Sequence, residues 1–215
     1  LPSTMTCIKS DVFSYSGLET ITVPDTITQI SSGAFAFCQN LTSVSLPDSL
    51  SDVRKQAFYN CTSLTDINIM TLLEAQTFQN CTSLTNVTLP DGLVKIEDYV
   101  FYNTGITSIT IPDSVTSLGI SAFSNCASLE SATLGSGLTK VDKWLPELLF
   151  FEDVTLGENI QKVDNFAFAE CGNLETITLP DSVTNIGISA FEKCRSLDDV
   201  KLPDGLTTVD KNAFL

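Results

Sequence analysis

Residues 174–196 read LETITLPDSVTNIGISAFEKCRS, and residues 106–128 read ITSITIPDSVTSLGISAFSNCAS. Both segments open with Leu or Ile, continue through Ile-Thr to Pro-Asp-Ser-Val, and close with Gly-Ile-Ser-Ala-Phe and a cysteine. Related segments recur along the whole chain at spacings of 20 to 23 residues. A fixed period of this length indicates a solenoid, because one turn cannot bury its apolar side alone and must stack on its neighbours.

The repeats predict one elongated solenoid domain over residues 1–215. A partial repeat occupies residues 1–17 and a truncated repeat residues 197–215. The complete repeats between them begin at residues 18, 41, 64, 84, 106, 129, 151 and 174. The chain therefore starts inside one repeat and stops inside another. Because solenoids need polar terminal turns for solubility, we expect a segment of a longer array.

The segment LTSVSLP, residues 41–47, shows how one turn is expected to fold. Leu41, Val44 and Leu46 are predicted to point inward and the polar residues between them outward, since a period of two is typical of a half-buried strand. Pro47 has no N–H to donate to a sheet and ends the strand. Stacked turns then place these strands about 4.8 Å apart, in a parallel sheet on one face of the domain.

Two more columns recur after the strand, one of phenylalanine and one of cysteine. We expect the phenylalanine rings to stack from turn to turn, an arrangement that aromatic rings favour. Buried cysteine behaves as a small apolar residue, and parallel ladders hold the Cβ atoms too far apart for disulfides. Cys7 stands outside the column, where other repeats are polar, and is predicted to be an exposed thiol. The two columns are Phe13, Phe35, Phe58, Phe78, Phe101, Phe123, Phe168, Phe191 and Phe214, and Cys38, Cys61, Cys81, Cys126, Cys171 and Cys194.

The pattern Leu-x-x-Ile-x-Leu-Pro-Asp-x-Val-x-x-Ile-Gly-x-x-Ala-Phe-x-x-Cys resembles the BspA-type leucine-rich repeat, and the resemblance covers the whole chain. It implies a β-rich leucine-rich-repeat solenoid, a right-handed superhelix of about nine to ten turns with a parallel β-sheet on one face. Proteins of this family are surface-exposed or secreted bacterial and protozoan proteins, and several act in adhesion to host proteins or other cells. The family has no fixed active-site motif, so the resemblance implies binding and names no catalytic residue.

The composition argues against several classes of function. The chain carries 26 acidic and 11 basic residues, a formal net charge of −15 at pH 7. Such a surface repels phosphate backbones and anionic lipids, so nucleic-acid binding is not expected. No apolar run approaches the roughly 20 residues that span a bilayer, so membrane insertion is not expected either. Histidine is absent, which removes Ser-His and Cys-His nucleophile pairs, and we expect neither an enzyme nor a cofactor.

The outward residues of the predicted sheet are the best candidate for a ligand-binding site. They are rich in hydroxyl groups, become more acidic toward the C-terminal half, and include no aromatic residue. Because interfaces usually depend on Trp, Tyr or Arg, two interpretations stay open: weak polar or carbohydrate contacts, or a solvated sheet without a ligand. The residues assigned to this face are Thr22, Ser45, Asn68, Thr88, Thr110, Thr133, Asp153, Thr155 and Thr178.

The repeat that begins at Leu129 is irregular and offers a second candidate surface. It carries Pro146 where the other repeats carry the stacking phenylalanine. Trp144 or Phe150 is the natural filler of that gap. In the alternative interpretation Trp144, Leu148 and Phe150 form an exposed apolar patch for a partner, since such patches commonly mark interaction sites.

Four Asn-x-Ser/Thr sequons occur in the chain. They are candidate N-glycosylation sites, although a chain so rich in Ser and Thr produces such triplets by chance. The modified residues would be Asn40, Asn60, Asn80 and Asn86.

A carboxylate also follows most of the predicted strands. Carboxylate oxygens are the ligands that Ca²⁺ prefers, but a turn residue repeats wherever its turn repeats. We favour the turn interpretation and expect no metal site. This row is Asp25, Asp48, Asp91, Asp113, Glu158, Asp181 and Asp204.

These features predict a non-enzymatic binding or adhesion module of a cell-surface or secreted protein. Its partner would be a protein or glycan of a host or neighbouring cell, recognised through the solenoid surface. The alternative is a structural module whose terminal turns stack head to tail into a fibre or surface layer, because exposed strand edges accept another chain.

Overall fold

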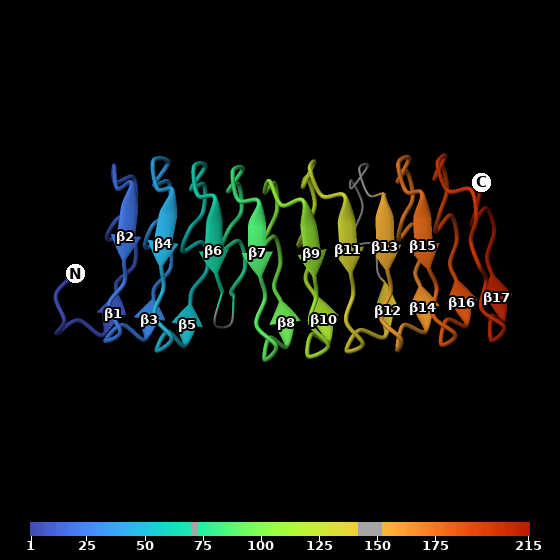
Figure 1. Ribbon diagram of the computed structural model, residues 1–215, viewed down its shortest axis with the longest axis horizontal. Helices are drawn as coiled ribbons and strands as arrows, with labels where there is room; N and C mark the ends of the chain where they lie inside the picture. Colours follow the sequence, from blue (N-terminus) through green and yellow to red (C-terminus); the bar gives the residue numbers. More distant parts are fainter. Residues whose placement is uncertain (70–72, 142–151) are drawn as a thin grey trace.

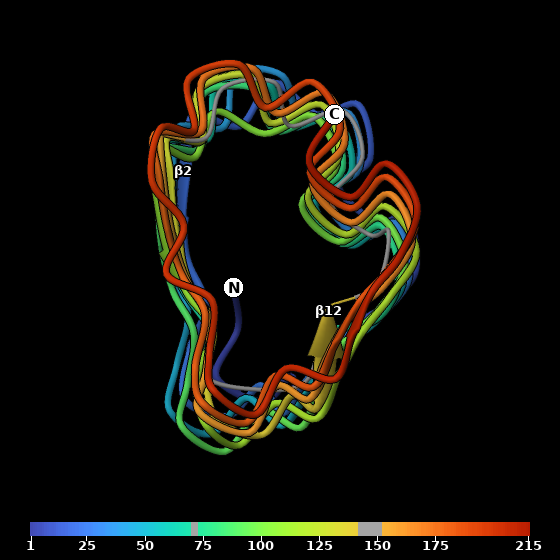
Figure 2. The same cartoon turned by 90° about the vertical axis from the view of Figure 1, so that its right-hand side faces the viewer.

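The computed structural model describes residues 1–69, 73–141 and 152–215, and these residues form seventeen short strands and no helix. The strands coil into a tube whose turns lie side by side between the two termini (Figure 1). Along the tube axis the turns superpose, and strands line two different sides of the cross-section (Figure 2). The predicted β-rich solenoid with a parallel sheet on one face is therefore confirmed.

Eight strands of three residues form the first side of the tube. They pair in parallel within two sheets, in the orders β2-β4-β6-β7 and β9-β11-β13-β15. These long strands are β2 (Thr20–Thr22), β4 (Ser43–Ser45), β6 (Asp66–Asn68), β7 (Asn86–Thr88), β9 (Ser108–Thr110), β11 (Ser131–Thr133), β13 (Asp153–Thr155) and β15 (Thr176–Thr178).

The eight long strands correct the predicted count of nine to ten turns. Each end of the chain supplies only part of a turn. Residues 1–17 begin past the position of a long strand, and residues 199–201 form no strand.

Nine strands of two residues form the second side of the tube. They also pair in parallel, in the orders β1-β3-β5, β8-β10 and β12-β14-β16-β17. In the shortest repeat the bridge between Val53 and Leu73 extends this series. The short strands are β1 (Cys7–Ile8), β3 (Gln29–Ile30), β5 (Asp52–Val53), β8 (Lys95–Ile96), β10 (Ser117–Leu118), β12 (Lys140–Val141), β14 (Lys162–Val163), β16 (Asn185–Ile186) and β17 (Thr208–Val209).

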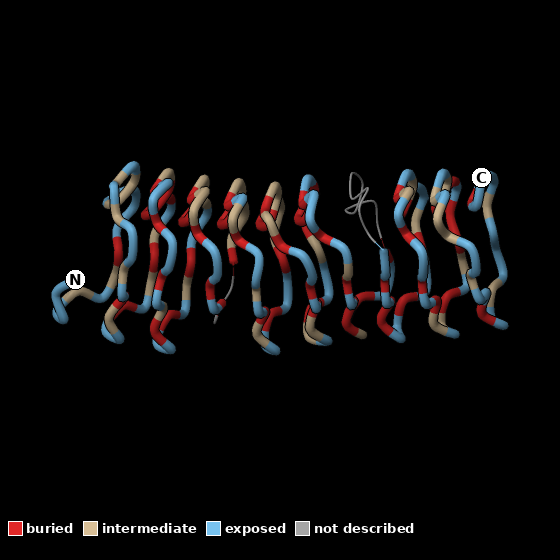
Figure 3. Tube along the Cα trace, turned by 45° about the horizontal axis from the view of Figure 1, so that its top comes forward, coloured by how far each residue is buried: buried red, intermediate tan, exposed pale blue. Residues whose placement is uncertain are grey.

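The interior follows the period-two pattern of the sequence. In β4 the central Val44 is buried while Ser43 and Ser45 are exposed, and most other long strands repeat this arrangement. Leu41 is fully buried and Leu46 is partly buried. Figure 3 shows buried segments recurring at equivalent places in successive turns. The core is therefore one continuous column of aliphatic and aromatic side chains along the tube.

The phenylalanine column stacks as predicted. Phe13 to Phe123 form one run of rings and Phe168 to Phe214 another, with centroids 5.0–5.7 Å apart and planes 3–13° from parallel. Seven of these rings are among the most deeply buried side chains of the described residues. Offset stacking at this spacing is favourable beyond the area that it buries. The filler predicted between the two runs lies outside the described residues.

The backbone on either side of each stacked phenylalanine adopts a left-handed conformation. The residue two before and the residue two after the ring have φ between 51° and 68°, and Gly33 is the only glycine among them. The N–H groups of Gly33, Phe35 and Phe37 donate to carbonyls of the next turn, and equivalent residues along the tube do the same. These hydrogen bonds hold non-glycine residues in a conformation that they rarely adopt. They form a third ladder of hydrogen bonds between turns, in addition to those of the long and short strands. The sequence pattern did not predict it.

The cysteines of the column are reduced, as predicted, and all of them except the half-buried Cys194 are buried. The seven cysteines are all free thiols. The Cys38, Cys61, Cys81, Cys126 and Cys194 thiols each donate to the carbonyl of the phenylalanine in the preceding turn, at 2.9–3.1 Å.

Cys7 corrects one prediction, because it is half-buried instead of exposed. Its Sγ lies 3.4 Å from Gln29 Oε1 and 3.5 Å from Ser31 Oγ. Polar side chains of the next turn therefore cover a position that the sequence assigned to solvent.

Candidate binding surface

The sheet face brings together the residues that the sequence assigned to it. Thr22 pairs with Ser45, and further along Thr133 pairs with both Thr110 and Thr155. All nine assigned residues are exposed. The nine residues therefore lie on an exposed polar face that extends over both sheets of long strands.

Some hydroxyl groups beside this face already bond within the solenoid. Thr42 Oγ1 donates to the Glu19 carbonyl at 2.9 Å, and Thr65 Oγ1 donates to the Thr42 carbonyl at 3.2 Å. On the strands themselves, Thr176 Oγ1 donates to Asp153 Oδ1 at 2.5 Å. Some of the hydroxyl groups therefore hydrogen-bond one turn to the next and have partners without any ligand.

The acidic residues gather on the same side. We define the long-strand side as the stretch, in each repeat, from the residue before the long strand to the tight turn after that strand. The equivalent residues of the last repeat, 198–204, are included. This side holds 15 of the 26 acidic residues, all of them exposed, and one of the 11 basic residues, Lys201. The acidic residues are Glu19, Asp25, Asp48, Asp66, Asp91, Asp113, Glu130, Glu152, Asp153, Glu158, Glu175, Asp181, Asp198, Asp199 and Asp204.

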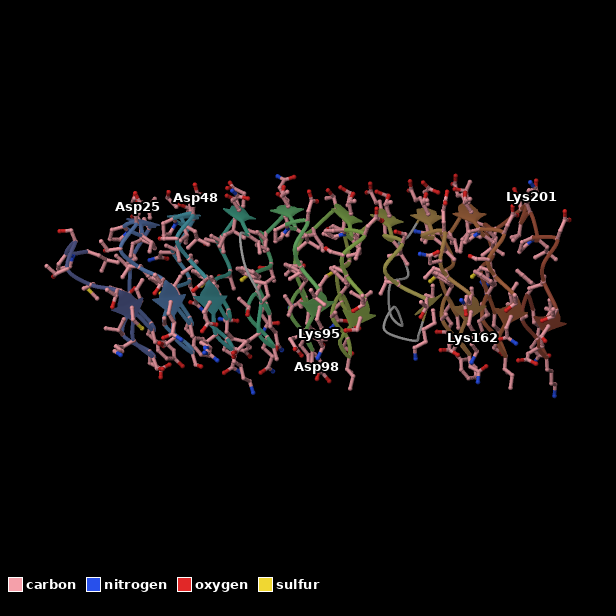
Figure 4. All side chains as sticks on the ribbon, turned by 90° about the horizontal axis from the view of Figure 1, so that it is seen from below. Asp25, Asp48, Lys95, Asp98, Lys162 and Lys201 are labelled. Carbon is pink, nitrogen blue, oxygen red and sulfur yellow. The ribbon has the colours of Figure 1, made fainter. Side chains whose placement is uncertain are left out.

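Figure 4 shows how acidic and basic side chains are placed around the solenoid. Asp25, Asp48 and Lys201 lie along one edge of the molecule, and Lys95 and Lys162 lie along the opposite edge. Nearly the whole net charge of −15 therefore falls on one side of the solenoid.

On the remaining surface, here called the opposite side, five of the nine described basic residues form ion pairs with described carboxylates. Arg54 contacts Asp52 at 2.6 Å and Glu74 at 2.8 Å, and Lys95 contacts Glu97 at 2.8 Å. The hydrogen bond to Glu74 raises the pKa of Arg54, and the hydrogen bond to Glu97 raises the pKa of Lys95. Within the described residues, no ion pair involves a carboxylate of the long-strand side.

The carboxylates of the turn row have a structural role in at least one turn. Asp113 Oδ1 accepts the backbone N–H of Ser136 in the next turn at 2.7 Å, and this bond lowers the pKa of Asp113. No group of three or more Cys, Asp or Glu side chains that could hold a metal ion occurs in the described part of the chain.

A stacked aromatic ridge is the surface feature that sequence reasoning missed. Tyr15 stacks on Phe37 with centroids 4.5 Å apart, and Phe37 meets the edge of Tyr59 at 5.2 Å. Tyr15 is 73% exposed. A shallow pocket of about 300 Å³ beside the first two rings is lined by Ser16, Gly17, Gln39 and Asn40 as well. The only signal in the sequence was an aromatic residue one or two positions after the stacking phenylalanine.

The sequons fall into two environments. Asn40 and Asn86 are exposed, and Asn86 lies on the long-strand side. Asn60 and Asn80 are half-buried and left-handed, and Asn80 Oδ1 accepts the amide of Asn103 at 3.0 Å. Glycosylation stays a prediction at all four residues.

The predicted partner patch of Trp144, Leu148 and Phe150 lies outside the described residues.

The described residues include no helix that is long and apolar enough to cross a membrane.

The repeat and its geometry agree with the comparison to known families. A family model of the BspA type leucine-rich repeat region matches the chain in six copies, over residues 1–75, 70–145 and 147–215. The chain belongs to the BspA-type leucine-rich repeat family.

Solved structures share the fold. A leucine-rich repeat protein from Bacteroides ovatus ATCC 8483 superposes with a TM-score of 0.79 at 32% identity, covering 94% of this chain and 54% of that one. A second, from Eubacterium ventriosum ATCC 27560, gives a TM-score of 0.66 at 22% identity, covering 100% and 63%. A leucine rich cell surface protein from Faecalibacterium prausnitzii A2-165 gives 0.53 at 24% identity, covering 97% and 74%.

The chain thus spans 54% and 63% of the first two of these proteins. The likenesses at 22% and 24% identity establish the fold alone. No protein with a curated description matches the sequence.

Proposed function

We propose that the chain is a non-enzymatic binding or adhesion module of a protein displayed on the cell surface or secreted. Its partner is a protein or glycan of a host or neighbouring cell, bound on the long-strand side. One observation carries the proposal: an exposed polar face runs along eight parallel strands in two successive sheets and has no described element packed over it. Extended surfaces of this kind are what solenoid proteins use for binding.

Membership of the BspA-type family supports a surface location. The F. prausnitzii protein with the same fold is a cell surface protein. The absence of histidine and the spread of carboxylates along an open sheet both weigh against catalysis, which needs groups that converge on one substrate atom.

The proposal is tested by binding assays with the 215-residue chain on glycan arrays and on immobilised extracellular-matrix proteins. A double variant, T110Y and T133Y, places two bulky side chains on neighbouring long strands. The matched control, T116Y and T139Y, places them at exposed threonines beside short strands. We expect the first variant to lose at least tenfold in affinity and the control to bind normally. Equal binding by both would remove the long-strand side from the proposal.

The structural alternative is head-to-tail stacking of terminal turns into a fibre or surface layer. At the C-terminal end of the tube Phe214 is 43% exposed, Val209 48% and Leu202 46%. A second copy could cover these side chains by head-to-tail stacking. Light scattering over a concentration series tests this, and a mass that stays at 23.2 kDa would contradict stacking.

A further inference from the structure

We propose that the long-strand side selects a cationic partner, a lysine- or arginine-rich segment of another protein. This inference rests on the proposed function and specifies the chemistry of the ligand. It starts from the distribution of charge, with 15 exposed carboxylates and one lysine on that side.

The charge is densest toward the C-terminal half. The four turns that begin at residues 129, 151, 174 and 197 hold nine of the 15 carboxylates. Glu130, Glu152 and Glu175 occupy one column there, because the Glu152 N–H donates to the Glu130 carbonyl and the Glu175 N–H donates to the Glu152 carbonyl. Asp153 lies beside this column on β13.

These carboxylates repel one another in the free protein. Neighbouring strands are about 4.8 Å apart, which is less than the Debye length of about 8 Å at physiological ionic strength. Like charges at such distances are unfavourable in a sheet. The hydrogen bonds to Asp113 and Asp153 come from neutral donors and leave the negative charge in place. A cationic partner would remove this repulsion, and the solenoid's own basic residues do not.

The arrangement fits a polypeptide better than a metal ion. The carboxylates are spread over several turns, and no described group converges on a point where one ion could bind. An extended chain advances about 3.3 Å per residue and points alternate side chains to the same side. Lys or Arg side chains on one side of such a peptide therefore recur about every 6.6 Å, against about 4.8 Å between turns, and can reach carboxylates on several turns. The absence of aromatic residues from the long strands favours electrostatic attraction over apolar anchoring.

The test uses a fluorescent 20-residue oligolysine, with oligoglutamate as the negative probe. The variant E130Q, E152Q, D153N, E175Q neutralises four carboxylates of the long-strand side. The matched control D11N, E97Q, E170Q, E192Q makes the same change in net charge on the opposite side. Circular dichroism melting of both variants checks that they fold. The dissociation constant is measured by anisotropy at 50 and 300 mM NaCl.

We expect the first variant to weaken oligolysine binding at least tenfold at 50 mM NaCl and the control less than threefold. Wild-type affinity should also fall at least tenfold at 300 mM NaCl. Equal weakening by both variants would mean attraction to net charge alone and would overturn the inference, as would failure of the wild type to bind. If T110Y with T133Y abolishes binding of a neutral glycan while the glutamine variant retains it, the proposed function stands and the cationic partner is wrong.

Discussion

The long-strand side and the opposite side come from the same repeat, yet their charges are arranged differently. The long-strand side has 15 exposed carboxylates and one lysine. On the opposite side the structure describes nine acidic and nine basic residues, and several of them form ion pairs. The stacked phenylalanines and the thiol hydrogen bonds also belong to the loops outside the long strands. The described ion pairs, ring stacks and thiol hydrogen bonds thus lie away from the exposed carboxylates of the long-strand side, so substitutions on the two sides should affect different measurements.

The largest effect on stability should come from the aromatic stack. Phe58 is fully buried and stacks on Phe35 and Phe78. Phe58→Ala removes both contacts and leaves a cavity, which should cost about 3–5 kcal/mol of unfolding free energy. Urea denaturation followed by circular dichroism measures the loss. Ser108→Ala, on the exposed face of β9, is the control and should change stability by about 0.5 kcal/mol or less. Similar losses of unfolding free energy in both variants would contradict the idea that the stacked phenylalanines stabilise the fold more than the exposed face of the long strands does.

Alkaline pH should destabilise the fold through the buried thiols. Burial raises the pKa of Cys171 to about 12 and that of Cys194 to about 11. The folded state keeps these protons while the unfolded chain releases them above its thiol pKa of about 8.5. Their stabilising contribution is therefore complete below pH 8.5 and is lost as pH rises toward 11–12. By pH 10 the loss should be on the order of 2 kcal/mol for Cys171 and smaller for Cys194, which is only half-buried and is partly screened by solvent.

Urea titrations at pH 8 and pH 10 measure this effect. Replacing Cys171 and Cys194 by alanine should flatten the dependence on alkaline pH, although the variant is less stable at pH 8. An unchanged alkaline slope would mean that other groups cause the loss.

A single thiol hydrogen bond should have a smaller effect. Cys81 Sγ donates to the Phe58 carbonyl at 3.1 Å. Cys81→Ala should cost about 1–2 kcal/mol, because packing and the hydrogen bond are both lost. Cys81→Thr should cost less than about 1 kcal/mol, since Thr104 already occupies this column, where its hydroxyl donates to the Phe101 carbonyl of its own turn at 2.9 Å. If threonine proves as damaging as alanine in denaturant melts, the hydrogen bond is not what the column requires.

The smallest effect should come from the ion pairs of the opposite side. Arg54 is about half exposed, so Arg54→Met should lower the unfolding free energy less than any core substitution above, and the loss should shrink in 0.5 M NaCl. A double-mutant cycle with Glu74→Gln isolates the pair. A coupling energy that does not depend on salt would indicate packing by the arginine stem instead of charge.

The repeat in the sequence was sufficient to predict most of the architecture. Period-two alternation in segments such as 41–47 assigned buried and exposed residues, and the spacing of the phenylalanines predicted their stack. These predictions succeeded because equivalent residues in a solenoid fall in register, so one turn stands for all. The predicted turn count was slightly high because register between equivalent residues does not reveal how much of a turn each end of the chain forms.

The tertiary structure alone decided which parts of one turn share a surface. Tyr15 and Phe37 follow their stacking phenylalanines by two residues and Tyr59 by one, so no single column contains the aromatic ridge, and the left-handed backbone brings the rings together. The same holds for charge. The sequence supplied the net value of −15, but glutamates before the strands and aspartates after them join into one acidic side only when the turn coils. Sequence periodicity specifies which residues repeat along the axis, whereas proximity around the axis depends on how the backbone closes each turn.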